Sequence, residues 1–316
     1  MAKVTIIGAT GNVGMFAAHA ISAIPHVSEI LLHGREGREA LLKGIAQDLG
    51  DSFAARGTDI RVNWTTNLKD IAGSDVVIIT AGVPRMPGQD RMDLATGNGR
   101  IIASLARQIG AIAPDTKILM VTNPVDVMTS VALKYSGLQP HQVFGLGTHL
   151  DSMRLKSLIA SYFQVHVSEV HTRIIGEHGD SMVPLWSATT IGGIKISNLP
   201  EFSHLPVQEI INSVKCSGQS IIQNKGSTVY GPGEAIASLV RTVLSDENRI
   251  LTVSAYIKSE VHGIGDICIG VPARINRKGV FPIAIRLDEA EVIAFRESVE
   301  KIRTSTKKVF ASLEEE

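Results

Sequence analysis

The chain has 316 residues, of which 44% are hydrophobic and 20% charged, and its formal net charge at pH 7 is zero. This composition excludes a disordered chain, allows two domains of ordinary size and argues against nucleic acid as a partner. Two cysteines far apart in the sequence, Cys216 and Cys268, favour a reducing cytoplasm over a disulfide scaffold or a thiolate metal site. No apolar stretch has the length or flanks of a membrane span or a signal peptide.

The first half of the chain alternates short apolar runs with longer runs whose apolar residues recur at helical spacing. We expect strands at Lys3–Ile7, Ile30–Leu32, Asp75–Thr80, Lys117–Val121 and Val143–Leu146. We expect helices at Val13–Ile24, Leu41–Leu49 and Ile101–Ile112, and another that begins after Pro124. Such alternation predicts an α/β fold with a Rossmann-type doubly wound parallel sheet, which binds its ligand at the carboxyl ends of the strands.

The pattern changes after about residue 148. Helices are expected at Asp151–Phe163, Pro206–Lys225 and Asp288–Ser312, with Asp288 as an N-cap, and strands at Ile250–Ile257 and Ile267–Ile275. Only the tail "LEEE" reads as disordered. We therefore predict a dinucleotide-binding domain over residues 1–147 and an α+β catalytic and substrate domain over residues 148–316.

A glycine-rich segment, "VTIIGATGNVG", follows the first strand and opens the first helix. Glycines allow a tight turn and a close approach to a pyrophosphate, which the free N–H groups of the helix attract. The spacing G-x-x-G-x-x-G is looser than G-x-G-x-x-G, and a tight strand-to-helix turn without a ligand is the alternative. The surrounding strands and helices favour a dinucleotide. The predicted contacts in this loop are Gly8, Thr10, Gly11, Asn12, Val13 and Gly14.

Gly34 lies twenty residues after Gly14, where an acidic residue usually binds the ribose 2′-hydroxyl of NAD. Gly34 removes the repulsion of a 2′-phosphate, and Arg35 can form a charge-assisted pair with that phosphate. Arg38 and His33 are close enough in sequence to add positive charge. A β-turn with solvated arginines is the alternative. The sequence predicts NADP as the preferred cofactor, with NAD also used but more weakly.

Four later stretches contain polar residues that packing does not require: "AGVPRMPGQDRMDL", "VTNPVD", "GTHLDSMRLK" and "IIGEHGDSMVP". Each has a structural alternative. His178 could be one of many surface histidines, Asp151 and Arg154 a helix-surface ion pair, and Arg85 and Arg91 solvated loop charges. No HExxH motif or Cys/His set is present, so no metal is expected.

These four stretches and the glycine-rich segment make five motifs. In this order and at these separations they resemble the lactate/malate dehydrogenase family along the whole chain, and most closely its archaeal lactate-dehydrogenase-like malate dehydrogenases. The resemblance implies that His178 donates and accepts the proton and that Asp151 orients it. It also implies that Arg154 binds the substrate's C1 carboxylate and that Arg91 polarises the carbonyl. Asn123 would contact the nicotinamide side of the site, with Asn98 and Val121 as further cofactor contacts. The residue types suit reduction of a 2-oxo acid.

Within this family, an arginine at the position of Arg85 accompanies a second substrate carboxylate, which implies oxaloacetate and malate. In the family the loop at this position closes over the substrate. With pyruvate bound, closure would leave Arg85 desolvated and unpaired, at a cost of up to ~3–5 kcal/mol. The alternatives are a lactate or other 2-hydroxy-acid dehydrogenase, an NAD-preferring malate dehydrogenase, a non-catalytic dinucleotide sensor and a glycoside-hydrolysing relative that needs a metal. The resemblance also implies a homo-oligomer, either a tetramer or a dimer.

Overall fold

The structure, a computed structural model, describes residues 1–83 and 91–315, and of Arg91 and Asp93 it describes the backbone alone. A nine-stranded sheet runs through the described residues in the order β14-β13-β12-β6-β5-β4-β1-β2-β3. Six of these strands are parallel: β1 (Ala2–Ile7), β2 (Val27–His33), β3 (Arg61–Thr65), β4 (Val76–Ile79), β5 (Lys117–Met120) and β6 (Val143–Gly145). Their order, 3-2-1-4-5-6, is that of a Rossmann-type sheet, as the sequence predicts.

Three antiparallel strands extend this sheet: β12 (Arg249–Ile257), β13 (Ile267–Asn276) and β14 (Gly279–Pro282). They join the parallel strands where Ser254 of β12 pairs with Gly145 of β6. The predicted boundary at residue 147 therefore falls between strands of one continuous sheet. Five short strands form two smaller sheets: β7 (Val170–His171), β8 (Ile174–Ile175), β9 (Val183–Pro184), β10 (Thr190–Ile191) and β11 (Ile194–Lys195).

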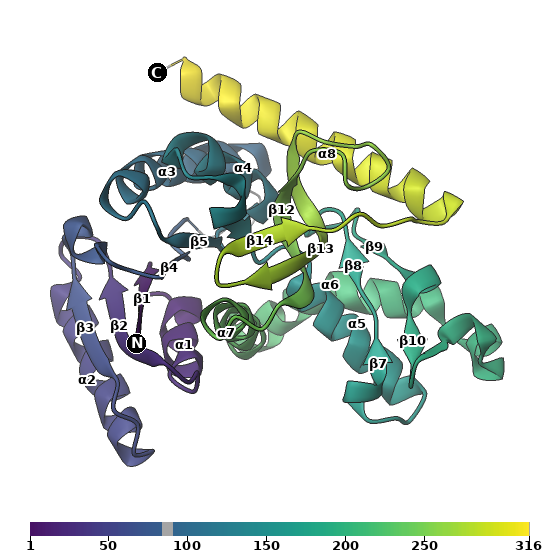
Figure 1. Ribbon diagram of the computed structural model, residues 1–316, viewed down its shortest axis with the longest axis horizontal. Coiled ribbons are helices and arrows are strands. Elements are labelled where there is room, and N and C mark those ends of the chain that lie inside the picture. Colours follow the sequence, from purple (N-terminus) through teal and green to yellow (C-terminus); the bar gives the residue numbers. More distant parts are fainter. Residues whose placement is uncertain (84–90, 316) are drawn as a thin grey trace.

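The described part of the chain has eight α-helices, most of which cover the two faces of the large sheet. They are α1 (Asn12–Ile21), α2 (Glu39–Ala55), α3 (Arg91–Ile112), α4 (Val125–Ser136), α5 (His149–Tyr162), α6 (Val207–Lys225), α7 (Tyr230–Leu244) and α8 (Glu289–Glu314). Side chains alternate across each strand. Ile6 therefore belongs to the apolar cluster with residues of α1, α2 and α7, whereas its neighbour Ile7 belongs to the cluster with residues of α3 and α4. Figure 1 shows α3 and α4 on one side of β4 and β5, with α1 and α7 on the other.

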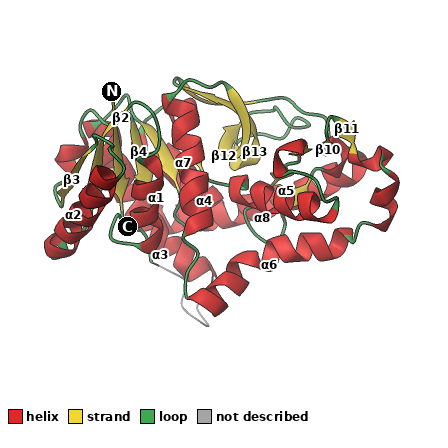
Figure 2. Ribbon diagram, turned by 90° about the horizontal axis from the view of Figure 1, so that it is seen from below, coloured by secondary structure: helices red, strands yellow, loops and turns green. Residues whose placement is uncertain are grey.

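A third apolar cluster lies outside the large sheet, between α5, α6 and the small strands, and contains Leu155, Ile174 and Val214. Figure 2 shows α5 and α6 with β10 and β11 at the end of the molecule opposite β3. None of the described helices is both long and apolar enough to span a bilayer.

The structure differs from the sequence-based expectation at several elements, including the short strands β7–β11, strand β14 and the start of α3 at Arg91. Strand β3 and helix α7 are additional; β3 has only one buried residue, and α7 begins with the helix-breaking letters "YGPG". The tail is helical as far as Glu314, because Lys134 of α4 binds that carboxylate and Val309 is buried. Both cysteines are free thiols; Cys268 is buried and Cys216 is exposed.

Candidate active site and dinucleotide-binding loop

The loops at the carboxyl ends of the parallel strands meet at one edge of the sheet. Gly8 follows β1 and Gly34 follows β2, and the carbonyl of His33 accepts hydrogen bonds from the backbone N–H groups of Gly8 and Ala9, at 3.0 and 3.2 Å. The two segments that the sequence assigns to a dinucleotide are thus directly connected. In doubly wound sheets this edge is where ligands bind.

The glycine loop has a backbone that side chains would disrupt. Gly8 has a φ of +91°, and a Cβ there would lie 2.6 Å from the backbone nitrogen of Ala81. A Cβ on Gly14 would lie 2.7 Å from the carbonyl oxygen of Gly8. Gly11 is the N-cap of α1, and no side chain caps this helix. The loop and the uncapped helix start therefore fit a pyrophosphate group.

Gly34 and Arg35 open the turn between β2 and α2. A Cβ on Gly34 would lie 3.1 Å from Leu42, so a larger side chain would have to displace Leu42 slightly. Arg35 and Arg38 are exposed, and neither forms an ion pair with another described residue. The expected contribution of His33 is wrong: its side chain is buried, and burial lowers the pKa of its imidazole, so it is neutral at pH 7.

Asn98 of α3 connects the loops that follow β4 and β5. Its side-chain oxygen accepts from the Val83 backbone N–H at 2.8 Å, and its amide donates to the carbonyl of Asn123 at 2.8 Å. Asn98 is 1% exposed, which makes it a connector of the loops in this structure. Thr122 adds a bond from its hydroxyl to the Ala81 carbonyl at 2.7 Å. Asn123 itself is exposed and lines the central cavity.

The polar cluster predicted from the sequence assembles around His178. This residue follows β8, and its Nδ1 lies 2.5 Å from Oδ2 of Asp151, which is in the first turn of α5. One helical turn further on, Arg154 donates from Nη1 to Oδ1 of Asp151 at 3.1 Å. The side chain of Asp151 is 1% exposed, whereas those of Arg154 and His178 are 17% and 28% exposed. The carboxylate is therefore buried behind two groups that remain accessible.

The electrostatics of this cluster favour an imidazolium. The charge of Asp151 raises the pKa of His178 to about 9, against the opposing effect of burial. Burial would raise the pKa of the Asp151 carboxyl, but His178 and Arg154 outweigh it and the pKa is lowered. With Nδ1 bound to Asp151, Nε2 is the ring nitrogen that can exchange a proton with a molecule in the cavity.

A cavity of about 680 Å³ joins the cluster to the dinucleotide edge. Its walls include Val13 at the start of α1, Val121 and Asn123 after β5, and the side chains of His178 and Arg154. Sequence reasoning missed one wall, which comes from α6, the segment after it and the first turn of α7. The additional lining residues there are Lys215, Gly218, Gln219, Ile222, Gln223, Thr228 and Pro232. An amphipathic helix far along the chain offered no signal that it would cover this site.

Two predicted substrate contacts lie outside what the structure describes. Arg85 falls in the undescribed segment 84–90, and only the backbone of Arg91, at the start of α3, is described. Their roles stay predictions from the sequence. In the described residues, no group of three or more His, Cys, Asp and Glu side chains is arranged to hold a metal ion.

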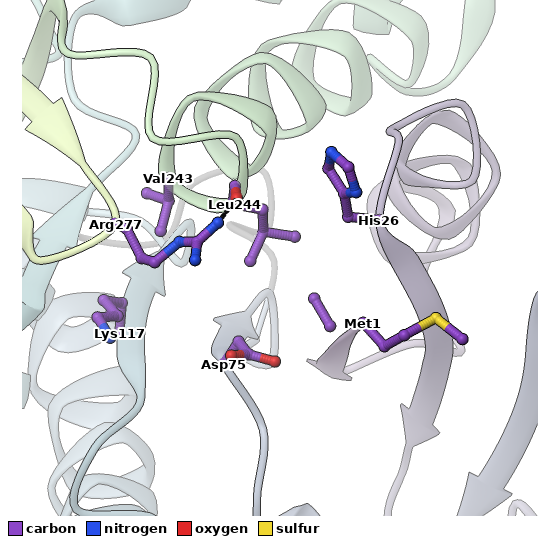
Figure 3. A pocket seen from close by; sticks show the side chains of 8 residues that line it. Met1, His26, Asp75, Lys117, Val243, Leu244 and Arg277 are labelled. Atoms are coloured by element: carbon purple, nitrogen blue, oxygen red, sulfur yellow. Dashed lines mark hydrogen bonds between the residues drawn. The ribbon is translucent and has the colours of Figure 1, made fainter.

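A second, smaller hollow of about 190 Å³ lies at the opposite edge of the sheet, near the amino ends of β1, β4 and β5. Figure 3 shows Asp75, Lys117 and Arg277 around it. Two of these side chains already form internal hydrogen bonds: Asp75 accepts from the backbone N–H of Lys3, and Arg277 donates to the Leu244 carbonyl. This hollow lacks a proton-transfer pair like that of His178 and Asp151.

A Rossmann-type sheet, a glycine loop at its carboxyl edge and a carboxylate-bound histidine in the adjoining cavity are the features expected of a dinucleotide-dependent oxidoreductase. The sequence agrees with the lactate/malate dehydrogenase NAD binding domain over residues 2–145 and with the α/β C-terminal domain of the same family over residues 148–313. The chain belongs to the lactate/malate dehydrogenase family.

Several relatives match this chain over nearly its whole length. It is 51% identical to the L-2-hydroxycarboxylate dehydrogenase (NAD(P)(+)) of Methanocaldococcus jannaschii, over 95% of this chain and 97% of that one. It is 47% identical to the malate dehydrogenase of Methanothermobacter thermautotrophicus, over 99% of both chains. The crystal structure of Plasmodium falciparum malate dehydrogenase superimposes with a TM-score of 0.93 at 29% identity, over 99% of both chains.

Proposed function

We propose that this enzyme is a malate dehydrogenase that interconverts oxaloacetate and (S)-malate, with NADP(H) preferred and NAD(H) used more weakly. The observation that supports this most strongly is the contact of His178 with Asp151, beside Arg154, in a cavity that reaches Val13 at the start of α1, directly after the glycine loop. Such a site offers a proton donor, an anion-binding group and space for a dinucleotide together.

In this proposal His178 donates the proton to the substrate oxygen during reduction and accepts it during oxidation. Asp151 holds the imidazole and stabilises its charged form. Arg154 binds the C1 carboxylate of the substrate through two parallel hydrogen bonds. Arg91 stabilises the charge that develops on the carbonyl oxygen, and Arg85 binds the second carboxylate.

The dinucleotide would be held by the glycine loop, with Gly8, Gly11 and Gly14 next to its pyrophosphate. When bound, its nicotinamide supplies or takes up the hydride. Thr10, Asn12, Val13, Val121 and Asn123 would contact it on the way to the cavity, while Asn98 positions the loop that carries Asn123. Arg35, with Arg38 nearby, would bind the 2′-phosphate.

A lactate dehydrogenase would use the same proton donor and the same carboxylate-binding arginine, and Arg85 is the residue that argues against it. Broader use of L-2-hydroxycarboxylates is the second candidate, because a relative with 51% identity carries that name. We further propose a homo-oligomer, a tetramer or a dimer, located in the cytoplasm. Sedimentation of the purified enzyme measures the oligomeric state.

The proposal is tested by following nicotinamide absorbance with oxaloacetate and pyruvate in turn. We expect kcat/KM to favour oxaloacetate by orders of magnitude, since each 1.4 kcal/mol of discrimination is about a factor of ten. Arg85→Gln should weaken or reverse this preference, because it removes the charge that pyruvate leaves unpaired. Equal kcat/KM for both substrates in the unmutated enzyme would exclude the proposed specificity.

A further inference from the structure

A second buried carboxylate, that of Asp126, lies beside the catalytic cluster. Asp126 is in the first turn of α4 and is 2% exposed. Its Oδ2 accepts the backbone N–H of His178 at 2.9 Å. His178 is therefore held by two carboxylates: Asp126 binds its backbone N–H and Asp151 binds its imidazole.

This contact connects elements that are far apart in the sequence. Asp126 follows the "VTNP" segment after β5, and Asn123 in that segment lines the cavity. The turn that carries His178 is held on its other side by α8, where the Ser298 hydroxyl accepts the Glu177 backbone N–H at 2.7 Å. The His178 backbone is thus held between α4 and α8, and Asp126 is the charged member of the pair.

The chemistry of Asp126 goes beyond that of a neutral hydrogen-bond acceptor. Its Oδ1 is buried and makes no hydrogen bond of ordinary geometry among the described residues, while the nearby Ser254 hydroxyl lowers the pKa of the carboxyl. Burial raises the pKa of Asp126 to about 6, so the group is mostly ionised at pH 7. An ionised carboxylate in a poorly solvated place exerts a strong field on its neighbours.

We propose that Asp126 is a positioning residue for the proton transfer, which fixes the His178 backbone and, through its negative charge, acts with Asp151 to keep the imidazole protonated. This proposal rests on the proposed role of His178. It assigns to the aspartate of "VTNPVD" a function in the enzyme's response to pH, in addition to its hydrogen bond.

The groups that face Asp126 come from three directions. Titratable neighbours are His178 and Glu177 on the turn after β8 and Cys268 on β13, while Ser254 on β12 is a neutral polar neighbour. Glu177 is paired with Lys301 of α8 at 2.7 Å. Burial raises the pKa of the Cys268 thiol to about 12, so this thiol is uncharged throughout the working pH range. Asp126 and His178 are therefore the pair that changes charge with pH.

Asp126→Asn tests the proposal, because asparagine keeps an acceptor for the His178 N–H but removes the charge. Titration of the His178 imidazole by NMR in the free enzyme reads the effect without requiring turnover. We expect the pKa of His178 to fall by roughly one unit, as is typical of losing a nearby opposite charge. The pH profile of malate oxidation should move to lower pH by the same amount.

Glu177→Gln is the matched control: it removes a carboxylate one residue from His178, but one that Lys301 and Ser181 already bind. Its effect on the His178 titration should be at most a few tenths of a unit. Should Asp126→Asn fail to fold, Ser254→Ala removes the hydroxyl beside the carboxylate and should lower the pKa of His178 by a smaller amount.

An unchanged His178 titration in folded Asp126→Asn, or in Ser254→Ala if the first variant does not fold, would overturn the proposal. A shift as large in Glu177→Gln as in Asp126→Asn would overturn it as well. A shifted titration without turnover on any 2-oxo acid would instead refute the proposed function and leave the effect of Asp126 on the imidazole established.

Discussion

At the scale of single residues, the site depends on a buried carboxylate that binds two partly accessible cationic groups. Asp151 is fully covered, while the two groups that it binds, His178 and Arg154, face the cavity. This order has a physical reason: a buried carboxylate with two cationic partners is stabilised, and it keeps the exposed imidazole charged. The first two predictions each concern a charged side chain and what it binds.

The first prediction concerns pH. Because the pKa of His178 is raised to about 9, the imidazolium persists from neutral pH up to that value. In the proposed mechanism oxaloacetate reduction uses the protonated ring, so it should stay level and fall above about pH 9. Malate oxidation would use the neutral ring and should rise as the pH approaches that value. The measurement is kcat/KM against pH in both directions.

Asp151→Asn checks the cause of this shift. Without the negative charge the pKa of His178 should fall by about one to three units, and both profiles should move with it. Profiles that stay in place would mean that Asp151 does not control the titration of the imidazole.

The second prediction concerns the cofactor. Arg35→Gln should raise KM for NADPH by about tenfold to a hundredfold, since a charge-assisted pair contributes ~1.5–3 kcal/mol. KM for NADH should change by about twofold or less, because NADH has no 2′-phosphate for Arg35 to bind. Arg61→Gln is the control, because this exposed arginine lies at the amino end of β3, away from the glycine loop. An equal rise for both cofactors would show that Arg35 does not read the phosphate.

At the scale of elements, the glycines of the first loop have different tasks. Gly8 is required by the fold, because a Cβ there would lie 2.6 Å from the Ala81 nitrogen and the φ is +91°. At Gly11 the nearest atom to an added Cβ is 3.4 Å away, an ordinary contact. Spacing alone could not separate these tasks, because both positions read as loop glycines.

The third prediction uses this difference. Gly8→Ala should lower the free energy of unfolding by about 2 kcal/mol or more, through backbone strain and the clash. Gly11→Ala should change it by about 0.5 kcal/mol or less. It should nevertheless weaken dinucleotide binding about tenfold or more, since the added methyl group would obstruct the pyrophosphate. Denaturant unfolding and cofactor titration measure the two effects. Unimpaired binding by Gly11→Ala would contradict the assignment of this loop.

At the scale of the whole molecule, the cavity exists because distant parts of the chain close around it. Val13 at the start of α1 and the segments after β5 and β6 form one wall, α5 and the turn after β8 another, and α6 with the start of α7 the third. A ligand that bridges these walls binds the folded chain alone and must stabilise it.

The fourth prediction follows from this linkage. NADPH at a hundred times its Kd should add about 2.7 kcal/mol to the free energy of unfolding, and NADH at the same concentration should add less. Thermal unfolding monitored by fluorescence gives the two shifts in Tm. In Arg35→Gln the difference between the cofactors should disappear. Equal Tm shifts in the unmutated protein would argue against a preference for NADP.

The sequence by itself determined the class of fold and the identities of the described cluster. Apolar strands alternating with amphipathic helices require a covered parallel sheet, and the motifs after the strands had to meet at its carboxyl edge. His178, Asp151 and Arg154 lie together as expected, since two of them are one helical turn apart and the third is on the "GEHGD" turn. These features are local or follow from the rules of parallel sheets.

Only the tertiary structure decided the charge state of His33, the role of Asn98, the end of the last helix and the third wall of the cavity. These properties depend on burial and on contacts between distant segments. Burial makes His33 neutral where its position suggested a charge, and it places Asn98 between two loops. Packing against α4 orders the tail as helix. It also brings α6 over the cavity and Asp126 under the His178 backbone. The desolvation and the long-range fields that set these properties arise when the chain is folded.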